Sequence, residues 1–347
     1  MKGSFSGLTE VPPEPIPLSV LTGFLGSGKT TLLSRVLAVP DLRDTAVLIS
    51  EFGAIALDHL LLEAAVDDVV ELPNGCTCCA VRQGLADSIY RLLRARQAAG
   101  RPPFRRIALE TSGLADPGPV LYTLSADAFL EAALRLDRVV TAIDVVAGAA
   151  TLDRYPEAVA QAAVADLLLL TKTDMVPIPD SLVQRLASLN PLAPIADARD
   201  ADAGTLLFGG SPKALPRPRL HATAVHAHGI YALSVRLRRP MSRLGFAVAL
   251  GGLARDHGEK LLRVKGLVEF SDRPHGPAGA GPAAIHAVQH TLYPPRWLER
   301  WPDADRASRL VFIVRDLEPD EILRRFADGE PACLDPSTPS LAQGNRR

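Results

Sequence analysis

The chain has 347 residues, of which 47% are apolar and 22% charged, and its formal net charge is −1. This length suits two domains, and the composition is that of a globular protein. The balanced charge gives no electrostatic reason to expect nucleic acid or an anionic membrane as a partner, and no apolar stretch reaches the roughly 18 residues of a membrane-spanning helix.

The N-terminal segment does not resemble a secretory signal. Prolines and Glu14 occupy the place where the apolar core of a signal would lie, and no small-residue cleavage site follows. We therefore expect the protein to be cytosolic, in a compartment that keeps thiols reduced.

Short apolar runs alternate with helical patterns through the first part of the chain. The runs are apolar throughout, which is typical of parallel strands covered on both faces. They predict a doubly wound, mainly parallel α/β sheet in a domain over residues 14–205. The expected strands are residues 16–22, 46–50, 67–72, 105–111, 137–144 and 166–172, and helices are expected from Lys29 onward, at 80–99 and at 117–134.

The second part of the chain has a different pattern. Prolines and glycines predict a linker at residues 206–227. Beyond it, alternating strand patterns and two helical segments predict a smaller α+β domain over residues 228–330. The expected strands are residues 230–237, 260–270, 283–293 and 309–315, with helices at 242–258 and 319–327. We expect the tail, residues 331–347, to be disordered.

The stretch GFLGSGKT matches the phosphate-binding pattern G-x-x-x-x-G-K-[ST], and it follows an expected strand and opens an expected helix. Its glycines let backbone N–H groups wrap a phosphate, and the helix N-terminus adds a partial positive charge. Lys29 is expected to reach the β- and γ-phosphates, and the Thr30 hydroxyl to ligate Mg²⁺. The predicted phosphate-binding residues are Gly23, Gly26, Ser27, Gly28, Lys29 and Thr30.

The segment IALETSGLADP follows another buried strand. A carboxylate at the end of that strand can hold Mg²⁺, so Glu110 is the second expected magnesium residue. Gly113 is a candidate sensor of the γ-phosphate, because only glycine lets the backbone approach an oxygen so closely.

The sequence LLLLTKTDMV places Thr171, Lys172 and Asp174 at the tip of a third buried strand. An aspartate carboxylate accepts two parallel hydrogen bonds, which suits the N1–H and exocyclic amino group of guanine. The usual guanine motif is N-K-x-D, and Thr171 replaces its asparagine. We expect GTP as the nucleotide, with an ATP-binding phosphotransferase as the main alternative.

Cys76, Cys78 and Cys79 lie within four positions in ELPNGCTCC, and the only other cysteine is Cys333. Three thiolates favour a soft ion such as Zn²⁺, and also accept Co²⁺. A structural zinc site usually has four ligands in two distant pairs, so three crowded thiols predict an incomplete coordination sphere that can release its metal. A strained disulfide and a redox pair are the weaker alternatives.

Four motifs in this order, GFLGSGKTTLL, ELPNGCTCC, ETSGLADP and TKTD, resemble those of the CobW-type family of metal-binding P-loop GTPases, also described as zinc-regulated GTPase metallochaperones. The second half of the chain is similar to the C-terminal domain of that family. The resemblance implies a GTP-hydrolysing enzyme that carries zinc, or in some members cobalt or another ion, and passes it to a metal-dependent client protein.

The resemblance also implies roles for individual residues. Residues 23–31 hold phosphate, which adds Thr31 to the set, and Lys29, Glu51, Glu110 and Gly113 are the expected catalytic residues. Thr30 and Glu110 are expected to bind Mg²⁺. The residues expected to recognise guanine are Thr171, Lys172 and Asp174. The transferable metal is expected to be held by Cys76, Cys78 and Cys79.

The segment SEFGAIALD resembles a family segment that switches between nucleotide and metal, and Glu51 in it is the expected fourth metal ligand. Association as a homodimer is a further expectation. Two alternative functions stay open: a regulatory GTPase with a structural zinc clip that docks a partner through its C-terminal domain, and a cobalt-handling protein of cobalamin synthesis.

Overall fold

The computed structural model of the chain describes residues 11–39, 42, 44–49, 69–71, 78–200, 203–209, 215, 227–272 and 281–329. The chain divides into two compact units, the first made of residues 1–187 and 193–220 and the second of residues 188–192 and 221–347. We describe each unit by itself. The domain boundaries that we expected, at residues 205 and 228, stay a prediction.

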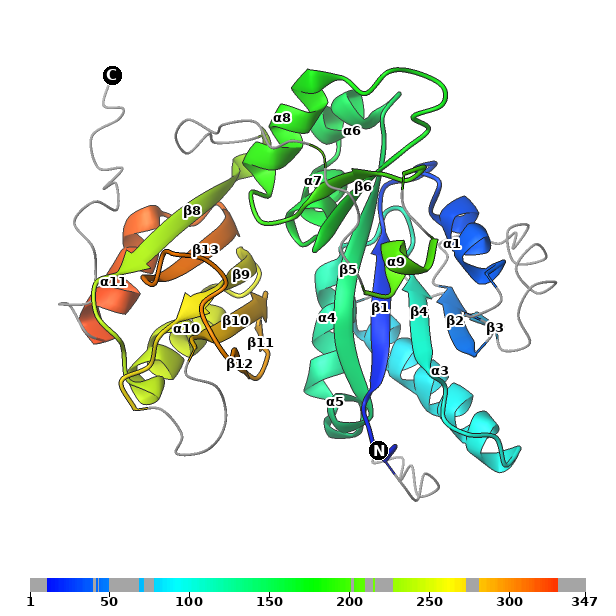
Figure 1. Cartoon of the computed structure of the whole chain (residues 1–347), viewed down its shortest axis with the longest axis horizontal. Helices are drawn as coiled ribbons and strands as arrows, with labels where there is room; N and C mark the ends of the chain where they lie inside the picture. Colours follow the sequence, from blue (N-terminus) through cyan, green and yellow to red (C-terminus); the bar gives the residue numbers. More distant parts are fainter. Residues whose placement is uncertain are drawn as a thin grey trace. The chain divides into compact units, whose positions relative to one another are not determined.

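A parallel sheet forms the centre of the first unit. Its seven described strands have the order β3-β2-β4-β1-β5-β6-β7, so that β1 lies between two strands that come much later in the chain (Figure 1). The expected doubly wound parallel sheet is confirmed. The strands are β1 (Ile16–Thr22), β2 (Thr45–Ile49), β3 (Val69–Glu71), β4 (Arg106–Glu110), β5 (Leu134–Asp144), β6 (Leu167–Thr171) and β7 (Ile195–Asp197).

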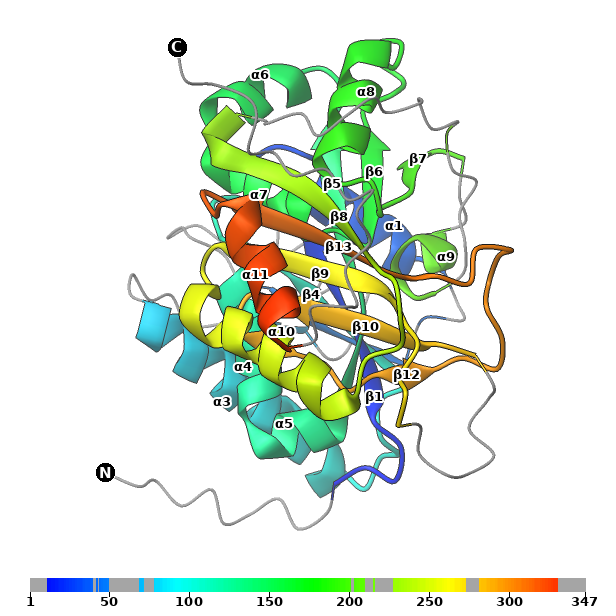
Figure 2. The same cartoon turned by 90° about the vertical axis from the view of Figure 1, so that its left-hand side faces the viewer.

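Helices cover both faces of this sheet. Figure 2 shows α1 and α9 on one side of the strands and α3, α4 and α5 on the other. The helices in this part of the chain are α1 (Lys29–Leu37), α3 (Cys78–Ala98), α4 (Pro117–Ala126), α5 (Ala128–Ala133), α6 (Gly148–Arg154), α7 (Pro156–Ala163), α8 (Asp180–Leu189) and α9 (Ala203–Leu207).

The strands are apolar because both of their faces are buried. The burial patterns of β2 and β6 contain no exposed position. On the side of α1, Leu33 and Val36 pack with Leu206 and Leu207 of α9 against strand residues such as Val140. This packing removes the alternation of polar residues that a half-exposed strand would show.

The expected helix at residues 117–134 is two helices, and Asp127 separates them. Its backbone is extended, and its carboxylate accepts hydrogen bonds from the N–H groups of Phe129 and Leu130, both at 3.0 Å. An aspartate that caps a helix in this way begins a new helix instead of continuing the old one. The same carboxylate accepts a hydrogen bond of 2.8 Å from the Tyr90 hydroxyl of α3.

In the described residues the second unit is an antiparallel sheet with two helices, and the expected α+β class is confirmed. Its strands have the order β11-β10-β9-β13-β8, and β12 also pairs with β10. The expected strand at 283–293 is a short hairpin, because Gln289 has a φ of 50° and reverses the chain. The elements are β8 (Ile230–Leu237), α10 (Arg243–His257), β9 (Leu261–Val268), β10 (Ala283–Val288), β11 (Thr291–Leu292), β12 (Arg296–Trp297), β13 (Ser308–Arg315) and α11 (Pro319–Gly329), preceded by a 3₁₀ turn at Ala227–Gly229.

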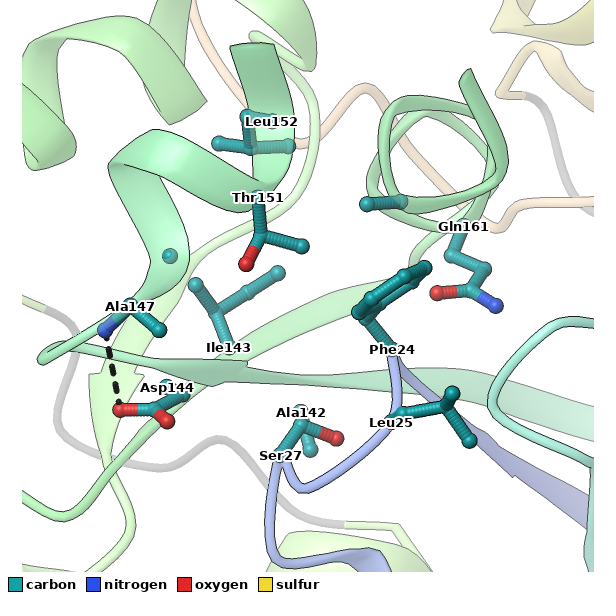
Figure 3. Close-up of a pocket in the computed structure, with 12 residues that line it drawn as sticks. Phe24, Leu25, Ser27, Ala142, Ile143, Asp144, Ala147, Thr151, Leu152 and Gln161 are labelled. Carbon is teal, nitrogen blue, oxygen red and sulfur yellow. Dashed lines mark hydrogen bonds between the residues drawn. The ribbon is translucent and has the colours of Figure 1, made fainter. Parts of the chain in front are cut away.

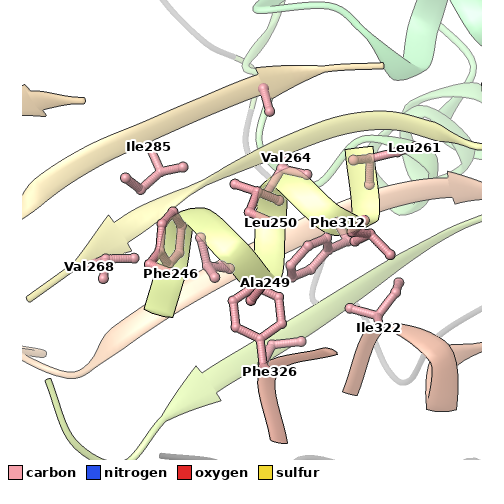
Figure 4. Close-up of a cluster of buried hydrophobic side chains, with 14 of the residues drawn as sticks. Phe246, Ala249, Leu250, Leu261, Val264, Val268, Ile285, Phe312, Ile322 and Phe326 are labelled. Atoms are coloured by element: carbon pink, nitrogen blue, oxygen red, sulfur yellow. The ribbon is translucent and has the colours of Figure 1, made fainter. Parts of the chain in front are cut away.

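Aliphatic side chains and several phenylalanines form the core of the second unit (Figure 4). Phe326 of α11 packs edge-on against Phe312 of β13, with ring centroids 5.7 Å apart, and Phe246 of α10 lies 6.0 Å from Phe326. Phe312 and Phe326 are fully buried. Both helices are thus held on the same face of the sheet.

None of the helices that the structure describes combines the length and apolar character that a bilayer-spanning helix requires.

Replacing Tyr90 with phenylalanine tests the contact between α3 and the cap of α5. Burial and the hydrogen bond to Asp127 raise the pKa of Tyr90 to about 12. Loss of the hydrogen bond should lower the free energy of unfolding by about 1 kcal/mol at neutral pH. The wild type should therefore have the larger free energy of unfolding at every pH below the unfolded tyrosine pKa of about 10. This difference is lost as pH rises toward 12, because the phenol ionises more easily in the unfolded chain than in the folded one.

Denaturant titrations of the wild type and Tyr90→Phe at pH 7 to 12 measure this difference. Tyr155→Phe, which removes the hydroxyl of an exposed tyrosine, is the control. A difference between wild type and Tyr90→Phe that does not change above pH 10 would contradict the assignment.

Candidate functional site

The loop between β1 and α1 carries the phosphate-binding pattern, and its backbone requires glycine. Gly23, Gly26 and Gly28 have φ angles of 140°, 70° and 85°, a region that residues with a side chain rarely adopt. A Cβ atom at Gly23 would lie only 2.4 Å from the carbonyl oxygen of Ala142. The phosphate loop therefore runs directly against strand β5.

Lys29 is the first residue of α1, and only 7% of it is exposed. Its ammonium group donates hydrogen bonds to the carbonyl oxygens of Gly23, at 2.9 Å, and Phe24, at 3.1 Å. Among the residues that the structure describes, no side chain caps the beginning of α1, where Gly28 precedes the helix. A buried ammonium group and a helix N-terminus without a side-chain cap thus belong to one loop, which suits an anionic phosphate.

Thr30 connects the phosphate loop to β4. Its hydroxyl Oγ1 donates a hydrogen bond of 2.9 Å to Oε1 of Glu110, the last residue of β4, which is 1% exposed. Hydroxyl and carboxylate oxygens are ligands that Mg²⁺ prefers, so the two residues predicted for this ion lie together and fit it chemically. Of the other predicted phosphate residues, Ser27 is buried in the loop and Thr31 is exposed on α1.

The loop after β4 carries Gly113 and lies against the phosphate loop. Thr111 begins it, with its N–H donating to Leu21 O at 2.9 Å and its hydroxyl donating to Thr22 Oγ1 at 2.8 Å. A Cβ atom at Gly113 would lie 2.7 Å from the backbone nitrogen of Leu25. Only glycine allows these two backbones to approach so closely.

The predicted guanine motif is also attached to the phosphate loop. The Thr171 hydroxyl, in a residue 7% exposed, donates a hydrogen bond of 2.7 Å to the carbonyl oxygen of Ser27. Lys172 follows in a left-handed conformation, with φ of 58°, and its ammonium lies 2.7 Å from Oδ2 of Asp144, at the end of β5. Thr171 therefore supports the phosphate loop, and Lys172 is held by a carboxylate of the neighbouring strand.

Asp174 is exposed at the tip of this motif, and no donor to its carboxylate is found in the described part of the chain. The preceding Thr173 donates a hydrogen bond of 2.6 Å to Asp197, which also accepts the N–H of Arg199 at 2.9 Å. Burial alone would raise the pKa of Asp197, but these hydrogen bonds and the Arg199 guanidinium outweigh it and hold the pKa below its ordinary value. An ionised Asp197 thus fixes the turn from which Asp174 projects.

The predicted thiol site cannot be built from the described residues. Cys78 and Cys79 are the first two residues of α3, but their side chains are not described, and Cys76 and Glu51 lie outside the described residues. Among the described residues, no group of three or more histidine, cysteine, aspartate or glutamate side chains could hold a metal ion. The thiolate site and the role of Glu51 therefore stay predictions.

A small pocket borders the phosphate loop on the side of α6 and α7 (Figure 3). The ring of Phe24 extends toward these helices and stacks on Tyr155, with centroids 4.4 Å apart. A volume of about 30 Å³ is enough for a water molecule but not for a nucleotide. This pocket is part of the support behind the loop.

Sequence reasoning missed the polar residues that support the site, namely Asp144, Asp197 and Gln161. Asp144 and Asp197 each end a buried strand, as Glu110 does, and that shared position was a signal. Gln161 is the single polar residue in the run AVAQAAVA, residues 158–165, and this isolated position was a weaker signal.

Two family models match the chain. The nucleotide-binding domain described as CobW/HypB/UreG matches residues 17–197, and the cobalamin synthesis protein cobW C-terminal domain matches residues 230–330. The first match spans every described element of the candidate site.

Known relatives are similar over most of the chain or over about half of it. Zinc chaperone YjiA of Escherichia coli is 33% identical over 321 residues, which cover 90% of this chain and 98% of the relative. Zinc-regulated GTPase metalloprotein activator 1 of Schizosaccharomyces pombe is 36% identical over 170 residues, 47% of this chain and 40% of that protein. A crystal structure of a Zn(II)-bound triple mutant of the YjiA GTPase superposes with a TM-score of 0.65 at 27% identity, covering 91% of this chain and 99% of that one.

Removing the Thr171 hydroxyl should weaken binding of both GTP and GDP. Thr171→Val keeps the shape of the side chain but leaves the Ser27 carbonyl without this donor, so we expect both dissociation constants to rise about 3- to 10-fold. Titration with fluorescent GDP and a non-hydrolysable GTP analogue measures the change. Thr171→Ser retains a hydroxyl and should stay within about twofold of the wild type; equal affinities for the valine and serine variants would refute this role.

Proposed function

The chain is a GTPase of the CobW/HypB/UreG family, and from this premise we propose that it is a metallochaperone, which carries zinc on its cysteine motif and transfers it to a client protein in a step coupled to GTP hydrolysis. The contact between Thr30 and Glu110 is the observation that carries the nucleotide half of this proposal, because it joins the phosphate loop to the predicted magnesium carboxylate. The similarity to a zinc chaperone and to a zinc-regulated GTPase metalloprotein activator supports the zinc half.

In the proposed nucleotide site, Lys29 and the backbone of residues 23–28 bind the phosphates. Thr30 and Glu110 would hold Mg²⁺, which supplies positive charge against the developing charge on the phosphates. Gly113 is the proposed γ-phosphate sensor, and its contact with Leu25 supports this role because it keeps the backbone of its loop next to the phosphate loop. Asp174 is the proposed guanine reader, and its exposed carboxylate supports the assignment.

The register of the sheet supports a connection between nucleotide and metal. Ile49 at the end of β2 pairs with Glu71 of β3 on one side and with Glu110 of β4 on the other. Two strand spacings, about 10 Å, therefore separate Glu71 from Glu110. Strand β3, which precedes the cysteine motif in the sequence, thus ends at the same edge of the sheet as the strand of Glu110.

The thiols at the start of α3 have a physical advantage as ligands. Cys78 and Cys79 open a helix of 21 residues. A helix N-terminus favours negative charge, and the thiolate is the form of cysteine that binds metal. We propose Cys76, Cys78 and Cys79 as the zinc ligands, with Glu51 as the fourth.

In this proposal the nucleotide state controls the metal, since the γ-phosphate orders loops in other GTPases and releases them on hydrolysis. One nucleotide state holds zinc tightly and the other exposes it to the client. Cobalt as the cargo, a homodimeric assembly and a cytosolic location remain further expectations.

Asp174→Asn tests the assignment of the base. Its amide presents a donor to the amino group of guanine, which is also a donor, so GTP affinity should fall about 100-fold. Xanthine has a carbonyl group in place of that amino group, so XTP should become the better substrate. Steady-state hydrolysis of GTP, XTP and ATP measures the preference, with the exposed Asp180→Asn as control; unchanged selectivity for GTP would argue against Asp174 as the reader.

Cys78→Ser tests the metal half of the proposal. We expect metal analysis of the purified protein to find about one zinc per chain in the wild type and far less in the variant, with nucleotide affinity unchanged. Cys333→Ser, which removes the cysteine outside the motif, is the matched control and should keep its zinc. The same zinc content in all three proteins would contradict the chaperone proposal.

Chelation distinguishes the proposal from a regulatory GTPase with a structural zinc clip. A carrier stays folded without its metal and can be reloaded, whereas a protein with a structural clip unfolds. Circular dichroism and thermal melting after chelation, followed by zinc titration, report which behaviour occurs.

A further inference from the structure

Gln161 is a fully buried amide whose only described side-chain hydrogen bonds go to the loop of the proposed γ-phosphate sensor. It lies on α7, whose other residues in this region are alanine and valine, and it is 0% exposed. Its Nε2 donates hydrogen bonds of 3.0 Å to the carbonyl oxygens of Gly113 and Ala115. One side chain thus occupies two backbone carbonyls of the same loop.

The chemistry fixes which way this amide points. Both carbonyls only accept hydrogen bonds, so the donating NH₂ group must face them and the oxygen must face away. Figure 3 shows the oxygen turned toward Phe24 and the pocket and the nitrogen turned away from them. Among the described residues, Oε1 has no hydrogen-bond partner.

Packing alone does not explain a glutamine at this position. Burying an amide costs free energy unless its polar atoms find partners, and leucine would fill a similar volume with no polar atom to satisfy. The amide gives direction, because two hydrogen bonds specify where the loop lies. The backbone of Gln161 is itself fixed, since its carbonyl accepts a hydrogen bond of 2.7 Å from the buried Thr141 hydroxyl of β5.

The sensor loop is thus attached at two points. At the start of the loop, the Thr111 hydroxyl donates a hydrogen bond to Thr22 of β1. Further along, the Gln161 amide of α7 donates hydrogen bonds to the loop. Gly113 is itself one of the two residues that Gln161 holds, and it has no room for a side chain next to Leu25. The position of its N–H relative to the phosphate loop therefore depends on Gln161.

We propose that Gln161 is a positioning residue of the GTPase site, which holds the Gly113 loop against the phosphate loop and so sets the discrimination between GTP and GDP. This role rests on the proposed function of Gly113 as the γ-phosphate sensor. GDP lacks the γ-phosphate, so its binding does not depend on the position of the Gly113 loop.

Two substitutions test the proposal. Gln161→Leu keeps most of the volume and removes both hydrogen bonds, so kcat/KM for GTP should fall about tenfold or more while the dissociation constant for GDP stays within about twofold. Val159→Ala, in the same helix and also buried, removes apolar contacts but no hydrogen bond and is the matched control. Thermal melting of each variant checks that it is folded.

Gln161→Glu provides a readout that a purely structural role would not move. Its carboxylate repels the two carbonyls, but the protonated acid donates one hydrogen bond. Burial raises the pKa of such a carboxyl, so the activity of this variant relative to the wild type should increase as pH falls from 8 toward 5. The leucine variant has no group that titrates and should show no such recovery.

The outcomes distinguish a failure of the role of Gln161 from a failure of the proposed function. A loss specific to GTP, with recovery of the glutamate variant at low pH, supports the proposal. Equal losses for GTP and GDP, or GTP kinetics like those of Val159→Ala in both variants, overturn the role of Gln161 while leaving the GTPase itself intact. If the wild-type protein binds GTP and GDP with equal affinity and does not hydrolyse GTP, the proposed function is overturned, and the role of Gln161 with it.

Discussion

The parallel pairing of β1 with β4 is the constraint on which the nucleotide site depends. The register joins Leu21 to Glu110, so the phosphate loop and the sensor loop leave the sheet at the same level, one strand spacing of about 4.8 Å apart. At that separation a side chain between the loops is excluded, and Gly113 meets the backbone of Leu25 directly. The hydrogen bond from Thr30 to Glu110 then joins the two segments at the position where a magnesium ion is proposed.

Buried polar side chains hold these loops where apolar packing alone would leave them free to shift. Thr22, Thr111, Thr141 and Gln161 are all fully buried, and each makes a hydrogen bond that links one strand, loop or helix to another. Such groups are costly to bury without partners, but when paired they specify a single arrangement. A site that must distinguish nucleotides differing by one phosphate gains from this directionality, because small displacements of the proposed sensor loop would change its contact with a γ-phosphate.

The sequence predicted the architecture because its signals are local. Continuous apolar runs marked six of the seven described strands of the first sheet, and the phosphate-binding pattern placed the loop on the correct strand. The three-residue strand β7 is too short to give a pattern, and the break at Asp127 depends on a cap that propensity alone does not predict. The contact of Gln161 with Gly113 joins residues 48 positions apart, and no local pattern indicates such a pair.

The threonine at position 171 shows how a departure from a motif can be interpreted from contacts. Its hydroxyl donates to the Ser27 carbonyl, and an asparagine amide is also a donor, so either residue can attach the phosphate loop to β6. The substitution therefore affects the support of the loop and leaves the proposed recognition of guanine to Asp174. Lys172, held by Asp144, and Thr173, held by Asp197, directly precede Asp174 in the turn that presents this carboxylate. Base selection in the proposed site thus depends on one exposed carboxylate whose orientation is set by two buried or half-buried carboxylates at the ends of β5 and β7.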